Sequence, residues 1–481
     1  MNAKTHYLAV DLGATSGRTI VASFDGSKVE MRELTRFKHP MVPIGGHLYW
    51  DLPHLFNEIL EGLKKVAAEG IEIQSVGIDT WGVDFAFFGK DGQPVGLPHC
   101  YRDEYTTGAM DRYFADRMPA KEVYAKTGIQ FMAFNSLFQL DTQRREGSCV
   151  LDAADKILFM PDALVYMLTG EAVCEYTIAS TSQILNPVTG DLDADLLKTL
   201  NLDRARFGRL VQPGEVVGTL TPQVQKATGL GPVKVVAVAG HDTASAVVSV
   251  PAKDAHFAYL SCGTWSLLGI ESPKPIITER SFQENFTNEG GIDGTTRFLK
   301  NICGLWIFEK CREDFYKDPV RFPGAPQGIK ELTALCLESD YDGNIFPDDE
   351  LVVHPDSMTE AICTYCSRTG QKAPETVADY LRCIYRSLAL RYKEVIGLLE
   401  EMGGFPIRSL NVIGGGSQNP YLMQFAADAC GIPVICGPTE GTALGNTLVQ
   451  LRADGKVGDL QAMRRISAAS VELKTYFPAN K

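Results

Sequence analysis

The stretch from Tyr7 to Val21, YLAVDLGATSGRTIV, places an aspartate and a loop of small residues between two apolar runs. This pattern predicts a β-hairpin whose loop presents backbone N–H groups. Gly13 and Gly17 permit positive φ and close approach of a ligand, while the hydroxyl residues add donors suited to phosphate. Asp11 ends a buried strand, where a carboxylate needs an ion-pair partner or a cation such as Mg²⁺ beside a nucleotide. A tight turn whose aspartate accepts loop amides explains the same residues equally well.

A second polar break lies within residues 74–88, QSVGIDTWGVDFAFF, between two apolar segments. Asp79, Trp81, Gly82 and Asp84 form a mixture suited to holding a sugar ring and stacking on it. A turn whose tryptophan belongs to the core is the alternative. The following segment, 101–103, is either a pocket wall or a surface ion pair.

The third candidate is the sequence VKVVAVAGHDTASA at 233–246, where a β-branched strand breaks at Gly240 and a helix begins at 241–243. Asp242 would lie at the carboxyl end of a strand and the N-terminus of a helix, where ligands of α/β sheets bind. Its alternative role is a helix N-cap. An N-cap needs neither the preceding glycine nor His241, so these two residues favour a functional role.

Residues 258–269, AYLSCGTWSLLG, repeat the opening pattern of apolar strand, small polar residue, glycine, hydroxyl and second apolar strand. The repeat is separated from Asp11 by about half the chain, which indicates two related domains rather than a solenoid. Two such loops can clamp a polyphosphate. A glycine triplet at 414–416, between a strand at 410–413 and a helix opened by Pro420, brings backbone against a flat or charged ligand or serves close packing alone.

Turn residues and the spacing of apolar residues elsewhere in the chain predict alternating strands and helices, which would position these loops. Asp25-Gly26 between apolar runs predicts a hairpin, so the chain opens as an antiparallel meander, unlike a dinucleotide-binding fold. Helical spacing predicts helices over 55–67, around 162–168 and over 377–398, the last closed by glycines at 403 and 404. We also expect a helix to start within 300–306, and residues 337–375 to form polar loops and short helices.

Composition narrows the classes of function. The 481 residues suffice for two domains, and 46 Lys and Arg against 59 Asp and Glu give a net charge of −13, which disfavours nucleic acid or an anionic membrane as a partner. Residues 1–6 lack signal-peptide features, and no stretch has the length of a membrane span. Twelve cysteines without a framework spacing suggest reduced cytosolic thiols. The lone CxxC at Cys363 and Cys366 is interpreted as two helical cysteines.

Six segments in this order resemble the FGGY carbohydrate kinases, of the superfamily that also contains actin, Hsp70 and hexokinase: DLGATSGR, DTWGVDF, GHDTASA, SCGTWS, KNICGLW and VIGGGSQN. The resemblance runs from Tyr7 to about Leu451. It is closest to the rhamnulokinase branch of the family, because GIDTWGVDF and YRD look particularly like that branch. It implies ATP-dependent phosphorylation of L-rhamnulose to L-rhamnulose 1-phosphate in L-rhamnose catabolism, in the cytoplasm, with ATP as co-substrate and Mg²⁺.

The resemblance also implies an α/β fold of two actin/hexokinase-like, ribonuclease-H-like domains with an interdomain cleft. The expected bounds are 1–248 for the N-terminal domain with the sugar site and first phosphate loop, 249–455 for the C-terminal domain with the second phosphate loop and adenosine site, and 456–481 for a tail. The sequence leaves the oligomeric state unknown.

The resemblance assigns roles to individual residues. Asp242 would be the general base, because in-line phosphoryl transfer needs an acceptor for the proton of the attacking hydroxyl. Asp11 would position Mg²⁺ through water. ATP would be bound by Ala14, Thr15, Ser16, Gly17, Arg18, Thr264, Glu309 and Gly415. The sugar would be bound by Gly82, His241, Asp242, Thr243 and Asn301. The second loop carries Ser261 where superfamily members often have aspartate, which leaves Asp11 as the expected metal-side carboxylate.

Two alternatives stay open at this stage. L-fuculose, L-xylulose or another ketose is a rival substrate, since pocket contacts decide the orientation of one hydroxyl. An actin- or Hsp70-like ATPase is the rival from another class, although it has no need of the 79–84 segment or of His241 and Asp242. A dinucleotide-binding oxidoreductase is least compatible, because neither glycine loop has the strand-to-helix GxGxxG context.

Overall fold

The computed structural model describes residues 4–353 and 355–479. Residues 1–3, at which signal-peptide features were sought, and residues 480–481 of the predicted tail lie outside the described part. The chain divides into two compact units that are discontinuous in sequence. Unit 1 comprises Met1–Ser249, Glu271–Phe298 and Gly441–Val471, and unit 2 comprises Val250–Ile270, Leu299–Glu440 and Glu472–Lys481. Each unit is an α/β structure, as the sequence predicted.

Unit 1 is built on a six-stranded sheet of order β13-β14-β6-β1-β2-β3. The strands are β1 (Thr5–Leu12), β2 (Ser16–Phe24), β3 (Val29–Lys38), β6 (Ile73–Thr80), β13 (Val216–Thr219) and β14 (Lys234–Val236). β1, β2 and β3 pair antiparallel, which confirms the predicted opening meander, whereas β6 is parallel to both β1 and β14. Because β1, β6 and β14 are parallel, their C-terminal ends lie at the same end of the sheet, although the three strands come from distant parts of the chain.

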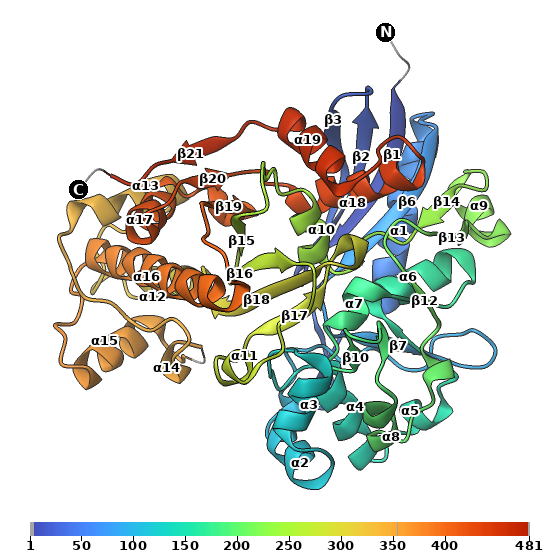
Figure 1. Ribbon diagram of the computed structural model, residues 1–481, viewed down its shortest axis with the longest axis horizontal. Helices are drawn as coiled ribbons and strands as arrows, with labels where there is room; N and C mark the ends of the chain where they lie inside the picture. Colours follow the sequence, from blue (N-terminus) through green and yellow to red (C-terminus); the bar gives the residue numbers. More distant parts are fainter. Residues whose placement is uncertain (1–3, 354, 480–481) are drawn as a thin grey trace. The chain divides into compact units, whose positions relative to one another are not determined.

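Helices cover both faces of this sheet. Leu8, Val10 and Leu12 point to the face of α1 (Leu52–Ala68), whose buried side includes Leu55 and Ile59. Tyr7 points to the opposite face, where it packs with residues of α18 (Gly441–Ala453) and α19 (Leu460–Ser470). Figure 1 shows these two helices beside β1, β2 and β3. Helix α10 (Asp242–Val248) packs against α18 so closely that a Cβ on Gly445 would lie 1.7 Å from the carbonyl oxygen of Ser245. Successive side chains of β1 point to opposite faces of the sheet, and helices cover its apolar residues on both faces. Unit 1 is therefore a three-layer α/β/α structure.

The rest of unit 1 consists of short elements around a second core. Strand β7 (Phe85–Phe88) pairs with β8 (Lys156–Phe159), and the predicted helix near 162–168 is α6 (Met160–Thr169), ended by Gly170 with φ 78°. The other helices are η1 (Glu104–Thr106), α2 (Ala109–Asp116), α3 (Ala120–Thr127), α4 (Ser136–Arg145), α5 (Cys149–Ala153), α7 (Tyr176–Ser180), α8 (Ala194–Thr199), η2 (Arg204–Arg206), α9 (Pro222–Thr228), α11 (Glu279–Gln283) and η3 (Ile292–Gly294). The other strands are β4 (Val42–Ile44), β5 (His47–Tyr49), β9 (Val173–Glu175), β10 (Leu185–Asn186), β11 (Asp191–Leu192), β12 (Arg209–Val211) and β17 (Thr287–Gly290).

The second large sheet has the order β17-β18-β16-β15-β19-β20-β21, and the chain passes between the units within β16 and β18. Its strands are β15 (Phe257–Cys262), β16 (Trp265–Ser272), β18 (Thr296–Cys303), β19 (Ser409–Ile413), β20 (Val434–Cys436) and β21 (Lys474–Tyr476). β15 is antiparallel to β16 and parallel to β19, which repeats the arrangement of β1, β2 and β6. The sequence repeat is therefore also a repeat of topology.

The helices of unit 2 are α12 (Trp306–Lys317), α13 (Ile329–Ala334), η4 (Leu335–Glu338), α14 (Glu350–Val353), α15 (Met358–Arg368), α16 (Val377–Gly403), η5 (Gly415–Gln418) and α17 (Pro420–Cys430). The predicted helix over 377–398 is confirmed as α16, which begins with a Thr376–Asp379 capping box and is followed by Gly404 in the left-handed region. Cys363 and Cys366 are helical residues of α15, as predicted.

The helix predicted to start within 300–306 is α12, which begins at the last residue of that segment, Trp306. Residues 300–303 belong to the end of strand β18 instead. All of β18 except Asn301 is buried, although Thr296, Arg297 and Lys300 are polar, so neither alternation nor an apolar run marks this strand in the sequence. Across the described residues, no helix combines the length and apolarity that crossing a membrane requires.

Candidate active site

The first glycine loop is a short hairpin turn closed by an ion pair. Asp11 and Arg18 face each other across β1 and β2, and Arg18 Nη2 lies 2.6 Å from Asp11 Oδ2. The turn is fixed by Gly13, whose N–H donates to the carbonyl of Ser16 at 3.0 Å. Thr15 is exposed at its tip. The loop therefore presents small side chains and backbone groups to solvent, with a nearly buried carboxylate at its base.

Positive φ, one of the two reasons predicted for the loop glycines, is wrong. Neither Gly13 nor Gly17 has a positive φ. At Gly17 a Cβ would lie 2.4 Å from the ring of Phe37, so glycine is required there by packing of β2 against β3. Gly13 has no close neighbour of this kind, since a Cβ there would meet only the carbonyl oxygen of Ser16 at 3.6 Å.

Asp79 is the carboxylate that sequence reasoning did not connect with Asp11. The two face each other in the parallel register of β1 and β6, and Asp79 is fully buried. Asn446 of α18 donates from Nδ2 to Asp79 Oδ2 at 2.6 Å, while Asp79 Oδ1 has no hydrogen-bond partner in the described structure. Burial, and next the charge of Asp11, raise the pKa of Asp79 well above its usual range; Asn446 opposes this and Asp242 adds to it. Asp11, Asp79 and Asp242 thus lie near one another.

The turn that carries Asp242 is held by two buried side chains. Glu175 Oε2 accepts the N–H of Gly240 at 3.0 Å, and Thr177 Oγ1 accepts that of His241 at 3.3 Å. Gly240 in turn accepts from the N–H of Thr80 at 2.9 Å, which attaches the turn to the end of β6.

Asp242 is the first residue of α10, and His241 holds the N-cap position without a side-chain capping bond. The alternative that Asp242 is the N-cap is therefore wrong. Its Oδ1 accepts the N–H of Thr243 at 2.5 Å and lies 3.1 Å from Thr243 Oγ1. The side chain is 30% exposed, so the carboxylate is open to solvent at the end of the strand layer.

His241 is held by a buried ion pair. Arg297 Nη2 lies 3.1 Å from His241 Nδ1 and 3.0 Å from Glu289 Oε2, and that oxygen lies 3.3 Å from His241 Nδ1. The other ring nitrogen, Nε2, lies 3.4 Å from Asp242 Oδ1. Burial would raise the pKa of Glu289, but the charges and hydrogen bonds of Arg297 and His241 outweigh it and lower that pKa. These contacts fix the ring edge that faces Asp242.

Sequence reasoning missed both Glu289 and Arg297. They stand in β17 and β18, in a segment without a glycine loop or motif. An arginine with no exposed surface is rare unless it is paired, yet nothing in the local sequence shows that this one is buried.

The segment 79–84 ends in a second buried carboxylate, Asp84. Its Oδ2 accepts hydrogen bonds from Trp50 Nε1 at 2.6 Å, Trp81 Nε1 at 3.0 Å and the N–H of Tyr101 at 3.1 Å, and its Oδ1 accepts from Gln139 Nε2 at 2.9 Å. Burial raises the pKa of Asp84 to about 6, although each of these four hydrogen bonds lowers it. Trp81 is buried and packs on Trp50, which agrees with the alternative prediction that this tryptophan belongs to the core.

Gly82 lies in a constrained turn beside this cluster. A Cβ at Gly82 would meet Thr181 Oγ1 at 3.2 Å, and the next residue, Val83, has φ 65° with its N–H donated to that same hydroxyl at 3.0 Å. A β-branched residue in the left-handed region is strained, and such strain concentrates at functional sites.

Four predicted site residues belong to unit 2. Thr264 is exposed in the β15–β16 turn, where its carbonyl accepts the N–H groups of Gly304 and Trp306, each at 3.1 Å. The start of α12 is thereby attached to the second hairpin loop. Glu309, in the first turn of α12, pairs with Arg312 at 2.5 Å, and Asn301 is half-buried on β18.

The glycine triplet packs against the end of β15. Gly414 has φ 85°, and a Cβ on Gly416 would lie 2.3 Å from Cys262 Sγ, so this turn needs glycine for conformation at one position and for space at another. A Cβ on Gly415 would meet nothing within 4 Å. Gly415 thus offers an open backbone surface near the second hairpin loop.

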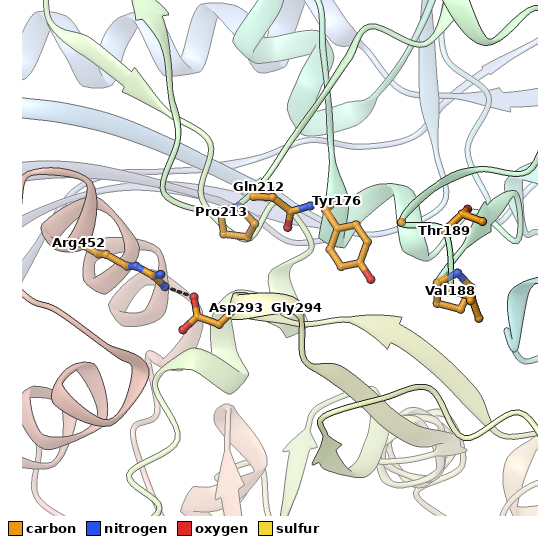
Figure 2. Close-up of a pocket in the computed structure, with 10 residues that line it drawn as sticks. Tyr176, Val188, Thr189, Gln212, Pro213, Asp293, Gly294 and Arg452 are labelled. Carbon is orange, nitrogen blue, oxygen red and sulfur yellow. Dashed lines mark hydrogen bonds and ion pairs between the residues drawn. The ribbon is translucent and has the colours of Figure 1, made fainter.

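Unit 1 also contains a cavity of about 440 Å³, drawn in Figure 2. It is lined by Tyr176, Pro187, Val188, Thr189, Gly190, Gln212, Pro213, Asp293, Gly294 and Arg452. An ion pair between Asp293 and Arg452 closes one side. None of the predicted site residues lines this cavity.

Comparisons with known proteins agree with this architecture. Residues 6–249 match the N-terminal domain and residues 258–453 the C-terminal domain of the FGGY family of carbohydrate kinases. A rhamnulokinase from Bacteroides thetaiotaomicron is 51% identical over 479 residues, covering 99% of this chain and 96% of that protein. A rhamnulokinase from Pectobacterium atrosepticum is 43% identical over 474 residues, covering 98% of this chain and 92% of the relative.

Solved structures confirm the fold class. The gluconate kinase of Lactobacillus acidophilus superposes with a TM-score of 0.81 at 15% identity, covering 99% of this chain and 94% of that one. The glycerol kinase of Plasmodium falciparum with ADP gives 0.80 at 14% identity, with the same coverage of 99% and 94%. With both family domains matched over nearly the whole chain, this protein belongs to the FGGY family of carbohydrate kinases.

Proposed function

We propose that this carbohydrate kinase transfers the γ-phosphoryl group of ATP to O1 of L-rhamnulose, giving L-rhamnulose 1-phosphate and ADP in L-rhamnose catabolism. The observation that carries the choice of sugar is the 51% identity to a rhamnulokinase across 99% of the chain. The geometry of unit 1 supports the chemistry, because a partly exposed carboxylate stands beside a fixed histidine at the end of the strand layer. We place the reaction in the cytoplasm, in keeping with twelve cysteines that are all free.

Asp242 is the proposed general base. Its Oδ1 is close to both His241 and Thr243, so the carboxylate has a defined orientation without being enclosed. A carboxylate so placed accepts the proton of the O1 hydroxyl as that oxygen attacks the γ-phosphorus in line. We assign sugar binding to Gly82, His241, Asp242, Thr243 and Asn301.

We assign ATP binding to the first loop, Ala14, Thr15, Ser16, Gly17 and Arg18, and to Thr264, Glu309 and Gly415. The two hairpin loops share one topology, and each offers exposed hydroxyl and backbone groups. Within the sequence we propose kinase domains at 1–248 and 249–455 and a tail at 456–481.

The residues around Asp11 fit a Mg²⁺ ion. The donors there are carboxylate oxygens, which Mg²⁺ prefers, and Asp79 Oδ1 is a buried oxygen without a hydrogen-bond donor among the described residues. Asp11 would hold the ion through water. When bound, Mg²⁺ would neutralise part of the phosphate charge, and the fold would keep Asp11 and Asp242 in fixed positions.

The test is ADP release from Mg·ATP by the purified protein, with L-rhamnulose, L-fuculose, L-xylulose and glycerol measured in parallel against a blank without sugar. We expect turnover to favour L-rhamnulose strongly. Preference for another ketose would overturn the proposed sugar, and equal ADP release with and without every sugar would indicate an ATPase instead.

A second test isolates the base. Asp242→Asn keeps the size of the side chain and removes its basicity, so kcat should fall by about 10²–10⁴-fold while ATP still binds. An Asp242→Asn protein with unimpaired kcat would refute the role.

A further inference from the structure

Three side chains of unit 1 outside the proposed active site form a cluster of metal-binding groups. His47, His99 and Asp103 each place one potential ligand atom within 4.8 Å of those of the other two. Elsewhere in residues 4–353 and 355–479, no three histidine, cysteine or acidic side chains come together in this way.

Backbone pairing holds the three residues in place. His47 begins strand β5, and Tyr49 of that strand forms a β-bridge with His99. Two further bonds join the same segments, from Trp50 N–H to the carbonyl of Pro98 and from Cys100 N–H to the carbonyl of Leu48, each at 2.9 Å. The two imidazoles therefore sit on paired backbone.

The side chain of Asp103 is held by hydrogen bonds to backbone N–H groups. It is the N-cap of η1, where its Oδ1 accepts the N–H of Tyr105 at 2.7 Å, and its Oδ2 accepts the N–H of Leu48. Its side chain is only 4% exposed. The carboxylate is thus oriented by hydrogen bonds, as the carboxylate ligands of protein metal sites are.

The distances between these side chains suit a cation. His47 Nδ1 lies 3.4 Å from Asp103 Oδ1, the separation expected for two ligands of one ion at bond lengths of about 2.0–2.2 Å and a near-tetrahedral angle. His99 Nδ1 is buried and has no hydrogen-bond partner in the described structure, which is unusual for a buried polar atom. The His47 side chain is 38% exposed, which leaves an approach for the ion and for water.

We propose that His47, His99 and Asp103 bind one divalent transition-metal cation, with Zn²⁺ as the best match. Two imidazole nitrogens and one carboxylate oxygen favour Zn²⁺ and its neighbours Co²⁺ and Ni²⁺ over Mg²⁺, which takes oxygen ligands. The site is therefore chemically distinct from the Mg²⁺ site proposed at Asp11. A bound ion would fasten the β4–β5 hairpin to the 98–105 segment, from which Tyr101 donates its N–H to Asp84.

The competing explanation is that the rings only pack. The His47 and His99 ring centroids lie 5.5 Å apart, and His99 stands 4.5 Å from Tyr105. Aromatic packing together with the Asp103 cap would give a stable loop without any ion. Direct measurement of binding separates the two explanations.

The experiment uses untagged full-length protein that has been treated with a chelator and dialysed. Zn²⁺ is titrated by calorimetry, and Co²⁺ is followed by its visible absorption, which is intense in four-coordinate sites. We expect one ion per chain with a dissociation constant in the micromolar range or tighter, unaffected by millimolar Mg²⁺.

His47→Gln and His99→Gln should each weaken Zn²⁺ binding at least tenfold. The control is His54→Gln, because His54 is similarly exposed, 34% of its side chain, and lies outside the cluster. Circular dichroism and melting curves establish that each variant is folded. Absence of stoichiometric binding in the parent protein, or equal affinity in all three variants, would overturn the proposal.

Discussion

Replacing Glu289 by glutamine keeps the shape of a buried side chain and removes its negative charge. In the parent protein Glu289 Oε2 lies 3.0 Å from Arg297 Nη2, and the Arg297 side chain has no exposed surface. The variant therefore leaves a guanidinium in the interior without its carboxylate. Breaking a buried pair by removing one partner typically costs about 3–5 kcal/mol. We expect the free energy of unfolding of Glu289→Gln to fall by that amount.

The effect should be specific to the pair. Glu289→Gln combined with Arg297→Met should destabilise less than the sum of the two single substitutions, because the double variant leaves neither charge unpaired. Glu279→Gln is the matched control, since Glu279 pairs with Lys121 at 2.6 Å on the surface, where the two side chains are 55% and 72% exposed. Chemical denaturation of the four variants and the parent gives all the required values. Equal stability of Glu289→Gln and Glu279→Gln would refute the reasoning.

The same substitution also has a kinetic and a pH consequence. Without Glu289 the His241 ring, which faces the proposed base Asp242, loses a contact at Nδ1. Misplacement of a group in an active site costs about 10²-fold in rate, so kcat should fall while the KM for ATP stays unchanged. Because folding lowers the pKa of Glu289 below its ordinary 4.5, its contribution to stability is present above that pH and is lost as pH falls through the folded value. The stability difference between parent and Glu289→Gln should therefore narrow in acid.

Two further predictions concern packing and protonation. Asp84 has its pKa raised by burial from 3.8 to about 6, so the folded protein loses roughly 3 kcal/mol of stability as pH rises through that interval. Asp84→Asn should flatten this decline in denaturation curves measured from pH 4 to 7, and an unchanged slope would contradict the assignment. At Gly445 a Cβ would lie 1.7 Å from the Ser245 carbonyl oxygen, so Gly445→Ala must separate α10 from α18 and should destabilise by at least about 1–3 kcal/mol. Melting curves should show no such loss for Gly458→Ala, where a Cβ meets nothing within 4 Å.

Features that depend on local sequence were predictable. The antiparallel pair β1–β2, the helix α16 with its capping residues and the repeat of the first hairpin at β15–β16 follow from periodicity, caps and turn residues within one segment. The position of Asp242 at the start of α10 was also visible, because the strand, the glycine break and the helix are contiguous.

Features that depend on tertiary pairing were not predictable. Asn446 reaches Asp79 from 367 residues away, and the contact of His241 with Glu289 and Arg297 joins three separate segments. Gly17 illustrates a second reason why sequence prediction fails. Its position in a loop suggested a positive φ, whereas in the structure a glycine is needed because a side chain at this position would clash with the ring of Phe37. Local patterns identify which residues are unusual, but the neighbour that makes them necessary comes from elsewhere in the chain.

The cluster of Asp11, Asp79 and Asp242 shows why the distant contacts matter for chemistry. Three ionised carboxylates at neighbouring strand ends would repel one another strongly, and Arg18 pairs with Asp11. Burial raises the pKa of Asp79, and the charge of Asp11, its partner in the register of β1 and β6, raises it further. Asp242 adds to this shift, although it stands at the start of α10, far along the chain. The electrostatics of the proposed site therefore depend on contacts between distant segments, which no local sequence pattern shows.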